Sequence, residues 1–63
     1  MLAQVYENVN GKDVPLGVED FDPLPSEGAI LTTTRNGKQV RLKVINVQNS
    51  GTGPDTSIYV EKL

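Results

Sequence analysis

Cysteine, histidine and tryptophan are all missing from this sequence of 63 residues. Without cysteine no disulfide can form, and without cysteine and histidine the usual zinc ligands are lacking. The same two absences remove the commonest general base and the most reactive nucleophile of enzymes. We therefore expect no enzyme activity, no metal and no cofactor. A chain this short is near the lower limit for independent folding, so it needs a compact core, self-association, or both.

Long hydrophobic runs are also lacking. No stretch approaches the roughly 18 apolar residues of a membrane span. The first residues, Met1 to Glu7, show neither a basic start nor the apolar stretch of a signal peptide. We expect a cytoplasmic protein that contacts no membrane. Hydrophobic residues make up 37% of the chain and charged residues 22%, which is typical of a globular domain, here a single one over residues 1–63.

Turn signals recur between short apolar runs, and this spacing predicts an all-β domain of five strands. Two Asn-Gly pairs, at residues 10–11 and 36–37, can adopt the positive φ angles of tight hairpin turns. A proline-rich connection, residues 22–28, and a polar loop, residues 49–55, separate the other runs. Leu24 should plug one end of the barrel. No window shows a helical period with start and stop signals.

The run after the first turn should be an edge strand. One of its faces should be apolar, because alternate residues are: Val14, Leu16 and Val18. Pro15 cannot donate to a ladder, which favours an edge position. Gly17 indicates a bulge or a sharp bend.

The fourth run predicts a bent strand. Val40, Leu42 and Val44 alternate with polar residues and should face inward. The phase breaks at Ile45, and Val47 continues on the opposite parity. Such a slip indicates a bulge or a bend where a strand crosses from one sheet to another.

Five strands, two Asn-Gly hairpins, a proline-rich crossing and a bent fourth strand together resemble a small five-stranded Src-homology-3-like barrel. The resemblance covers most of the chain and rests on element order and on Leu24-Pro25-Ser26-Glu27-Gly28 opening a strand. The chain is also similar to short uncharacterised bacterial and phage barrels that end in patterns like Ile58-Tyr59-Val60-Glu61. An oligonucleotide-binding fold is the alternative architecture.

The function of the Src-homology-3 family does not carry over to this chain. Its peptide-binding members line their groove with several aromatic residues, including tryptophan, whereas this chain has only Tyr6, Phe21 and Tyr59. Phe21 should belong to the core. If the strands of Tyr6 and Tyr59 pair, the two rings form a small aromatic patch, which is more typical of stabilising cover than of a ligand platform.

Four basic residues within nine positions, with no acid among them, form the candidate binding surface: Arg35, Lys38, Arg41 and Lys43. Strand alternation puts Arg41 and Lys43 on one outward face, while Arg35 and Lys38 flank the second Asn-Gly turn. A stripe of this kind can contact phosphates or an acidic protein partner, and it can also be no more than solvated charge on an edge strand. However, the pI of the domain is near 4.8, far below that of typical nucleic-acid-binding domains.

These features favour a non-enzymatic small interaction module that binds a protein surface, with a second copy of the chain among the candidate partners. The alternative is a weak nucleic-acid-binding barrel that uses the basic face of the fourth strand. Residues 1–31 carry one base and six acids, whereas residues 32–63 carry five bases and two acids. The second half of the chain can therefore form one basic surface, which is compatible with both functions.

Overall fold

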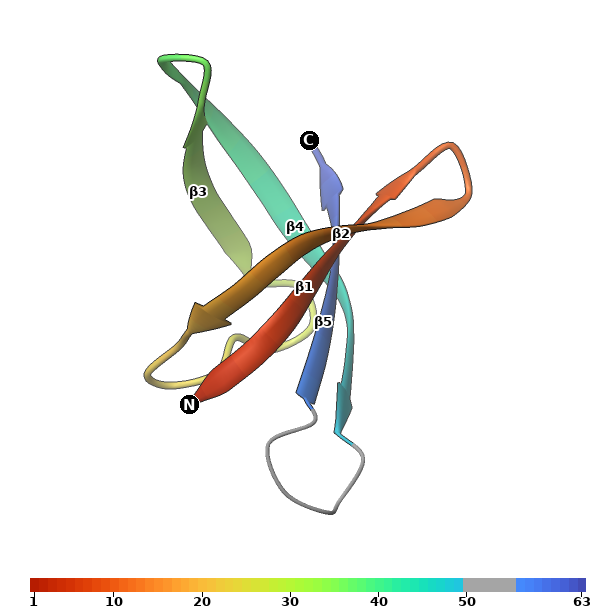
Figure 1. The fold of residues 1–63 in the computed structure, drawn as a ribbon, viewed down its shortest axis with the longest axis vertical. Helices are drawn as coiled ribbons and strands as arrows, with labels where there is room; N and C mark the ends of the chain where they lie inside the picture. Colours follow the sequence, from red (N-terminus) through yellow and green to blue (C-terminus); the bar gives the residue numbers. More distant parts are fainter. Residues whose placement is uncertain (50–55) are drawn as a thin grey trace.

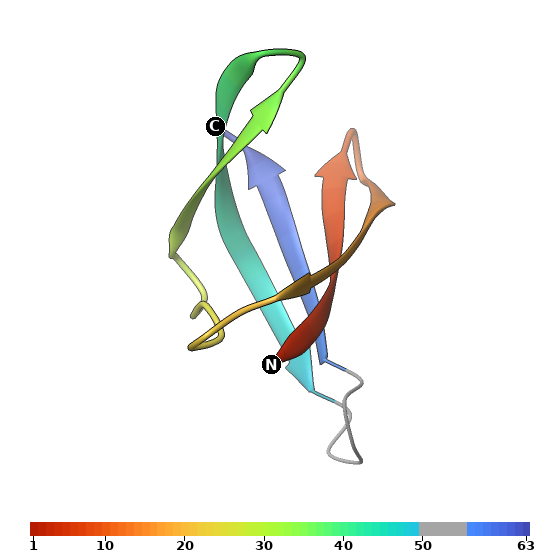
Figure 2. The ribbon, with the colours of Figure 1, turned by 60° about the vertical axis from the view of Figure 1, so that its left-hand side comes forward.

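The computed structural model describes residues 1–49 and 56–63, and this part of the chain is all-β (Figure 1). Its strands are β1 (Leu2–Val9), β2 (Lys12–Asp20), β3 (Ile30–Arg35), β4 (Lys38–Asn49) and β5 (Thr56–Lys62). They form one sheet in the order β2-β1-β5-β4-β3. The sheet curls into a half-barrel, with β2 and β3 at its two ends (Figures 1 and 2). The predicted small all-β barrel class is confirmed.

Within residues 1–49 and 56–63, the structure has no helix of the length and apolarity that a membrane crossing requires. Of the predicted polar loop, residues 50–55 lie outside the described residues.

Each end of the sheet is a two-stranded antiparallel unit, β1 with β2 and β3 with β4. Asn10 and Gly11 connect the first pair with φ angles of 54° and 83°, and Asn36 and Gly37 connect the second with 52° and 76°. Positive φ at both central residues gives a turn whose twist matches that of the flanking strands. β5 joins the two units, because it pairs in parallel with β1 and antiparallel with β4.

The core lies on the concave face of the half-barrel, where the three central strands point every second side chain. Its buried hydrophobic residues are Ala3 and Val5 of β1, Leu42 and Val44 of β4, and Ile58 and Val60 of β5. Phe21 and Leu24, from the connection after β2, are half-buried and pack against this cluster. Both residues thus contact the core, as predicted, but as half-buried residues at its margin.

β4 changes phase at Ile45, as its sequence predicts. Val44 and Asn46 lie opposite consecutive residues of β5, so Ile45 is the extra residue of a β-bulge. Leu42 and Val44 are buried before the bulge, and Val47 packs against the core after it. The bulge thus keeps both halves of this 12-residue strand facing the core while the strand bends.

β2 also contains a bulge, and it is the edge strand that Pro15 predicts. Val5 of β1 lies opposite Gly17, but the next residue, Tyr6, lies opposite Pro15. Leu16 is therefore the extra residue, beside the glycine that indicated a bulge or bend.

The bulge in β2 makes the prediction of one apolar face wrong. Residues that lie directly opposite each other in an antiparallel pair share a face of the sheet. Val14 lies opposite the buried Glu7, on the concave face, whereas Val18 lies opposite the exposed Gln4, on the convex face. Neither valine is covered, since Val14 is 44% and Val18 62% exposed, and Leu16 between them is 44% exposed.

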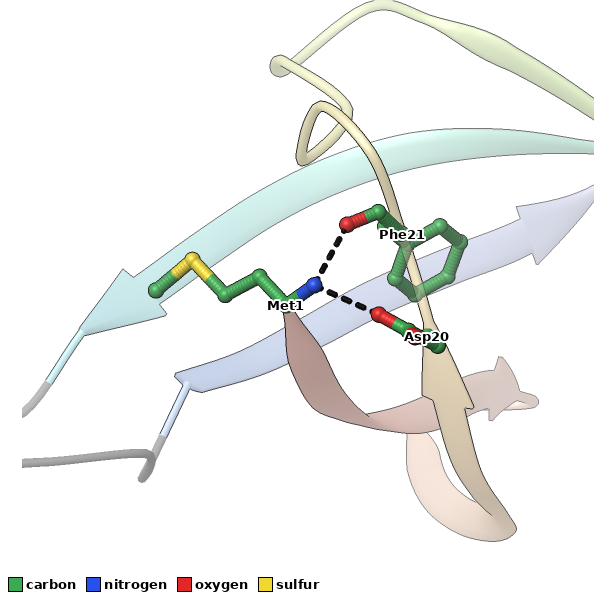
Figure 3. A network of polar contacts seen from close by, with 3 residues as sticks. All are labelled: Met1, Asp20 and Phe21. Atoms are coloured by element: carbon green, nitrogen blue, oxygen red, sulfur yellow. Dashed lines mark hydrogen bonds and ion pairs between the residues drawn. The ribbon is translucent and has the colours of Figure 1, made fainter.

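The amino group of Met1 ties the start of β1 to the end of β2 (Figure 3). It donates to Asp20 Oδ1 at 2.5 Å and to the Phe21 carbonyl oxygen at 2.8 Å. The Phe21 N–H donates back to the Met1 carbonyl oxygen at 2.8 Å. These contacts continue the β1–β2 ladder by one residue and fix the position of Phe21 beside the core.

Candidate binding surface

A groove of about 410 Å³ lies on the concave face, between β2 and β3. Within residues 1–49 and 56–63 no ladder joins these two strands, so the half-barrel is open along this side. We call this feature the open groove. It is lined by Val5 of β1, Leu16 and Glu19 of β2, Phe21 beyond it, residues 31–35 of β3 and Leu42 of β4. The core residues Val5 and Leu42 give the groove an apolar floor.

An ion pair crosses one end of the concave face. Arg35 Nη2 of β3 lies 2.6 Å from Glu7 Oε1 of β1. The Glu7 side chain is 10% exposed and the Arg35 side chain 34%. Because β1 and β3 are not neighbours in the sheet, this pair connects the two halves of the half-barrel across the concave face.

The four basic residues predicted as a binding surface are divided between the two faces of the sheet. Arg35 lies opposite Lys38 at the hairpin end and points to the concave face, where it is paired with Glu7. Arg41 and Lys43 flank the buried Leu42, so their exposed side chains lie on the convex face, as predicted. The structure thus brings Arg41 and Lys43 together and separates them from Arg35 and Lys38, which share the concave side.

The convex face near these two residues is not uniformly basic. Glu61 of β5 lies directly opposite Lys43 of β4, on the same face. A nucleic-acid backbone lying along β4 would therefore meet the carboxylate of Glu61 beside Arg41 and Lys43. This arrangement weakens the attraction that a basic stripe offers to nucleic acid.

The predicted aromatic patch is confirmed. Tyr6 and Tyr59 lie opposite each other in the parallel β1–β5 pair, and their rings stack with centroids 5.2 Å apart and planes at 17°. Pro15 flanks Tyr6 on β2, and Asn46 flanks Tyr59 on β4. Each ring therefore has a neighbour on both sides along the row, which fits cover for the convex face better than a platform for a ligand.

The two edges of the sheet differ in how strongly they resist pairing. β2 carries Pro15, a bulge and four charged residues, which are features that protect edge strands from adding another strand. β3 reads Ile-Leu-Thr-Thr-Thr-Arg, with no proline, glycine or acid. Its one charge, on Arg35, is already paired. We call the side of Ile30–Arg35 that faces away from β4 the β3 free edge, since no described strand pairs with it.

The hydrogen-bond pattern shows which residues of β3 point their backbone N–H and C=O groups toward this edge. The Val44 N–H donates to the Ala29 carbonyl oxygen at 2.8 Å, so the Ala29 carbonyl points toward β4, as it does at a hydrogen-bonding position of the ladder. Hydrogen-bonded pairs alternate along an antiparallel ladder. Ile30, Thr32 and Thr34 therefore turn their N–H and C=O groups away from β4. The only sequence signal for this edge is an uncharged run rich in β-branched residues, which by itself does not show that the strand lies at an edge.

Comparisons of the chain with protein-family models, curated proteins and solved structures gave no significant match. Its function therefore has to follow from the open groove, the β3 free edge and the convex basic residues.

Proposed function

We propose that this chain is a non-enzymatic interaction module that binds an extended segment of a protein along the β3 free edge and over the open groove. The observation that carries this proposal is the adjacency of an unprotected strand edge and an apolar-floored groove. In recognition by strand addition, backbone hydrogen bonds give affinity, and pockets for alternate side chains give specificity.

The chemistry of the groove indicates what the bound segment should contain. An added strand would bond to the outward N–H and C=O groups of Ile30, Thr32 and Thr34. Every second side chain would then face the concave side, where Leu31 is half-buried and Leu16 is 44% exposed. Covering these two leucines favours binding by about 25 cal/mol for each Å² of apolar surface removed from water. We therefore expect a segment with apolar residues at alternate positions.

The competing proposal is a weak nucleic-acid-binding barrel that uses the basic face of β4. Exposure of Arg41 and Lys43 on one face supports it. The pairing of Arg35 with Glu7 and the acid opposite Lys43 weaken it. We rank it second for these two reasons.

For the architecture behind either function we propose a distant Src-homology-3-like barrel located in the cytoplasm. Five strands and the bend in β4 support the barrel assignment. The resemblance is a distant one, because the predicted barrel is built from hairpins, whose strands pair antiparallel. Here β1 and β5 pair in parallel.

A displayed library of random peptides, selected on the purified domain, tests the proposed function. We expect the selected peptides to alternate apolar and polar residues. Leu16→Asp, on the wall of the groove, should weaken their binding at least about tenfold, because an apolar contact is replaced by a charge. Val18→Asp is the matched control, since it lies on the same strand, is more exposed and faces the other side. Equal losses in both variants, or no selected peptide, would exclude the open groove as the binding site.

A further inference from the structure

We infer that two copies of this chain pair through their β3 free edges, with the two Ile30–Arg35 strands antiparallel about a twofold axis. The inference rests on the proposed function and names the partner as a second copy. It starts from the contrast between the edges, because a pairing-competent β3 and a protected β2 leave β3 as the strand that can extend the sheet.

In one register, all the β3 residues whose N–H and C=O groups point away from β4 find partners. With Thr32 opposite Thr32 of the second copy, Ile30 lies opposite Thr34 of that copy, and Thr34 opposite its Ile30. These positions are the hydrogen-bonding ones, so the seam would contain about six backbone hydrogen bonds. At these positions threonine faces threonine, a favourable cross-strand pair, and threonine faces isoleucine, while Leu31 lies opposite Thr33.

The charges around this seam permit the pairing. Arg35 would lie opposite Ala29 of the second copy and is already paired with Glu7. On the convex face, the two Arg41 side chains would be three strand spacings apart, about 14 Å. This separation exceeds the screening length of about 8 Å at physiological salt, so their repulsion is small. No like charges meet within the paired segments.

The chain also gives reasons why the added strand is its own. A domain with a thin core and no disulfide gains stability from oligomerisation. In addition, residues 32–34 are all threonine, so an antiparallel copy of this segment presents the same side chains. Pairing of β3 with β2 of another copy is hindered by Pro15 and the bulge. The association therefore closes as a twofold dimer instead of continuing as a fibre.

The expected dimer is weak. β3 has six residues, and a strand of that length spans about 20 Å. The surface it covers is below the roughly 800 Å² per partner of a stable interface. A dissociation constant on the order of 100 μM fits a contact of this class.

A charge swap at Thr32 tests the inference, measured by sedimentation equilibrium of the full chain from about 10 μM to 1 mM. The wild type should change from monomer to dimer over this range. Thr32→Lys and Thr32→Glu should each weaken the association at least about fivefold, because each puts like charges directly opposite each other at the twofold axis. An equimolar mixture of the two variants should recover the dimer mass. Thr32 is exposed, so both variants should keep the strand-type circular dichroism of the wild type.

A wild type that stays monomeric over the whole range would overturn the dimer. So would variants that associate as the wild type does, or a mixture that fails to recover the dimer. None of these results would bear on peptide binding, because that function is tested separately with Leu16→Asp and Val18→Asp.

Discussion

Removal of Arg35 and removal of the Glu7 charge should lower the free energy of unfolding by different amounts. The Glu7 side chain is 10% exposed, so its carboxylate depends on Arg35, whereas the Arg35 side chain is 34% exposed and can turn to water. Arg35→Met should therefore destabilise the fold by about 3 kcal/mol, since it leaves a buried charge unpaired. Glu7→Gln should cost about 1 kcal/mol. Urea unfolding of the two variants checks this order, and the reverse order would show that the buried Glu7 carboxylate does not depend on Arg35.

Leu42 and Arg41 are adjacent in the chain but belong to opposite faces of β4. Leu42 is 4% exposed within the core, so Leu42→Ala should cost about 2–5 kcal/mol. Arg41→Ala, on the convex face, should lie within about 0.5 kcal/mol of the wild type. A domain this small has only about 5 kcal/mol to lose, so the Leu42 variant should be largely unfolded at 37 °C. Similar unfolding midpoints for the two variants would contradict the assignment of the faces.

Among the elements, the turn between β3 and β4 sets the register in which β3, the strand of the proposed binding edge, pairs with β4. Gly37 has a φ of 76°, and a Cβ at this position would have no other atom within 4 Å. Gly37→Ala should therefore cost about 1–2 kcal/mol through backbone strain alone. A chemically synthesised chain with D-alanine at the same position is the control, because D-residues favour positive φ. If both alanines destabilise the chain equally in thermal unfolding, the residue does not adopt this turn conformation.

The elements also show how far the sequence could predict the fold. The strands and the bend at Ile45 followed from alternation and turn residues, which are local signals. The face of β2 did not, because Gly17 indicated a bulge or a bend without showing which residue would be the extra one. The parallel β1–β5 pair was also not predicted, since residues about 50 positions apart in the chain leave no local pattern for their pairing.

At the scale of the whole molecule, the candidate site was predicted only in part. Alternation correctly put Arg41 and Lys43 on one outward face. Arg35 was grouped with them because it is close in sequence, but its ion-pair partner, Glu7, comes from a strand that is distant in the chain. The β3 free edge depends on the order of all five strands, so its role emerged from the sheet topology.

The division of the basic residues changes what a DNA titration should show. If only Arg41 and Lys43 contact phosphate, log K should fall with log salt at a slope of about −1.8, or about tenfold between 50 and 200 mM salt. Fluorescence anisotropy with a short labelled duplex measures this slope. Arg41→Glu/Lys43→Glu should abolish binding, and Lys12→Glu/Lys62→Glu, with the same change in charge, should weaken it much less. A slope near −3.6, the value for four phosphate contacts, would contradict the separation of the four bases.

The most direct test of the β3 free edge as the binding surface is a concentration series of amide-resolved NMR spectra of the unmodified chain. From about 50 μM to 1 mM, the amide signals of Ile30, Thr32 and Thr34 should shift progressively and their hydrogen exchange should slow, because these N–H groups gain partners in the second copy. The amides of β2, residues 12–20, should stay unchanged. Shifts centred on β2 or on Arg41 and Lys43, or no concentration dependence at all, would contradict the assignment of β3 as the pairing edge.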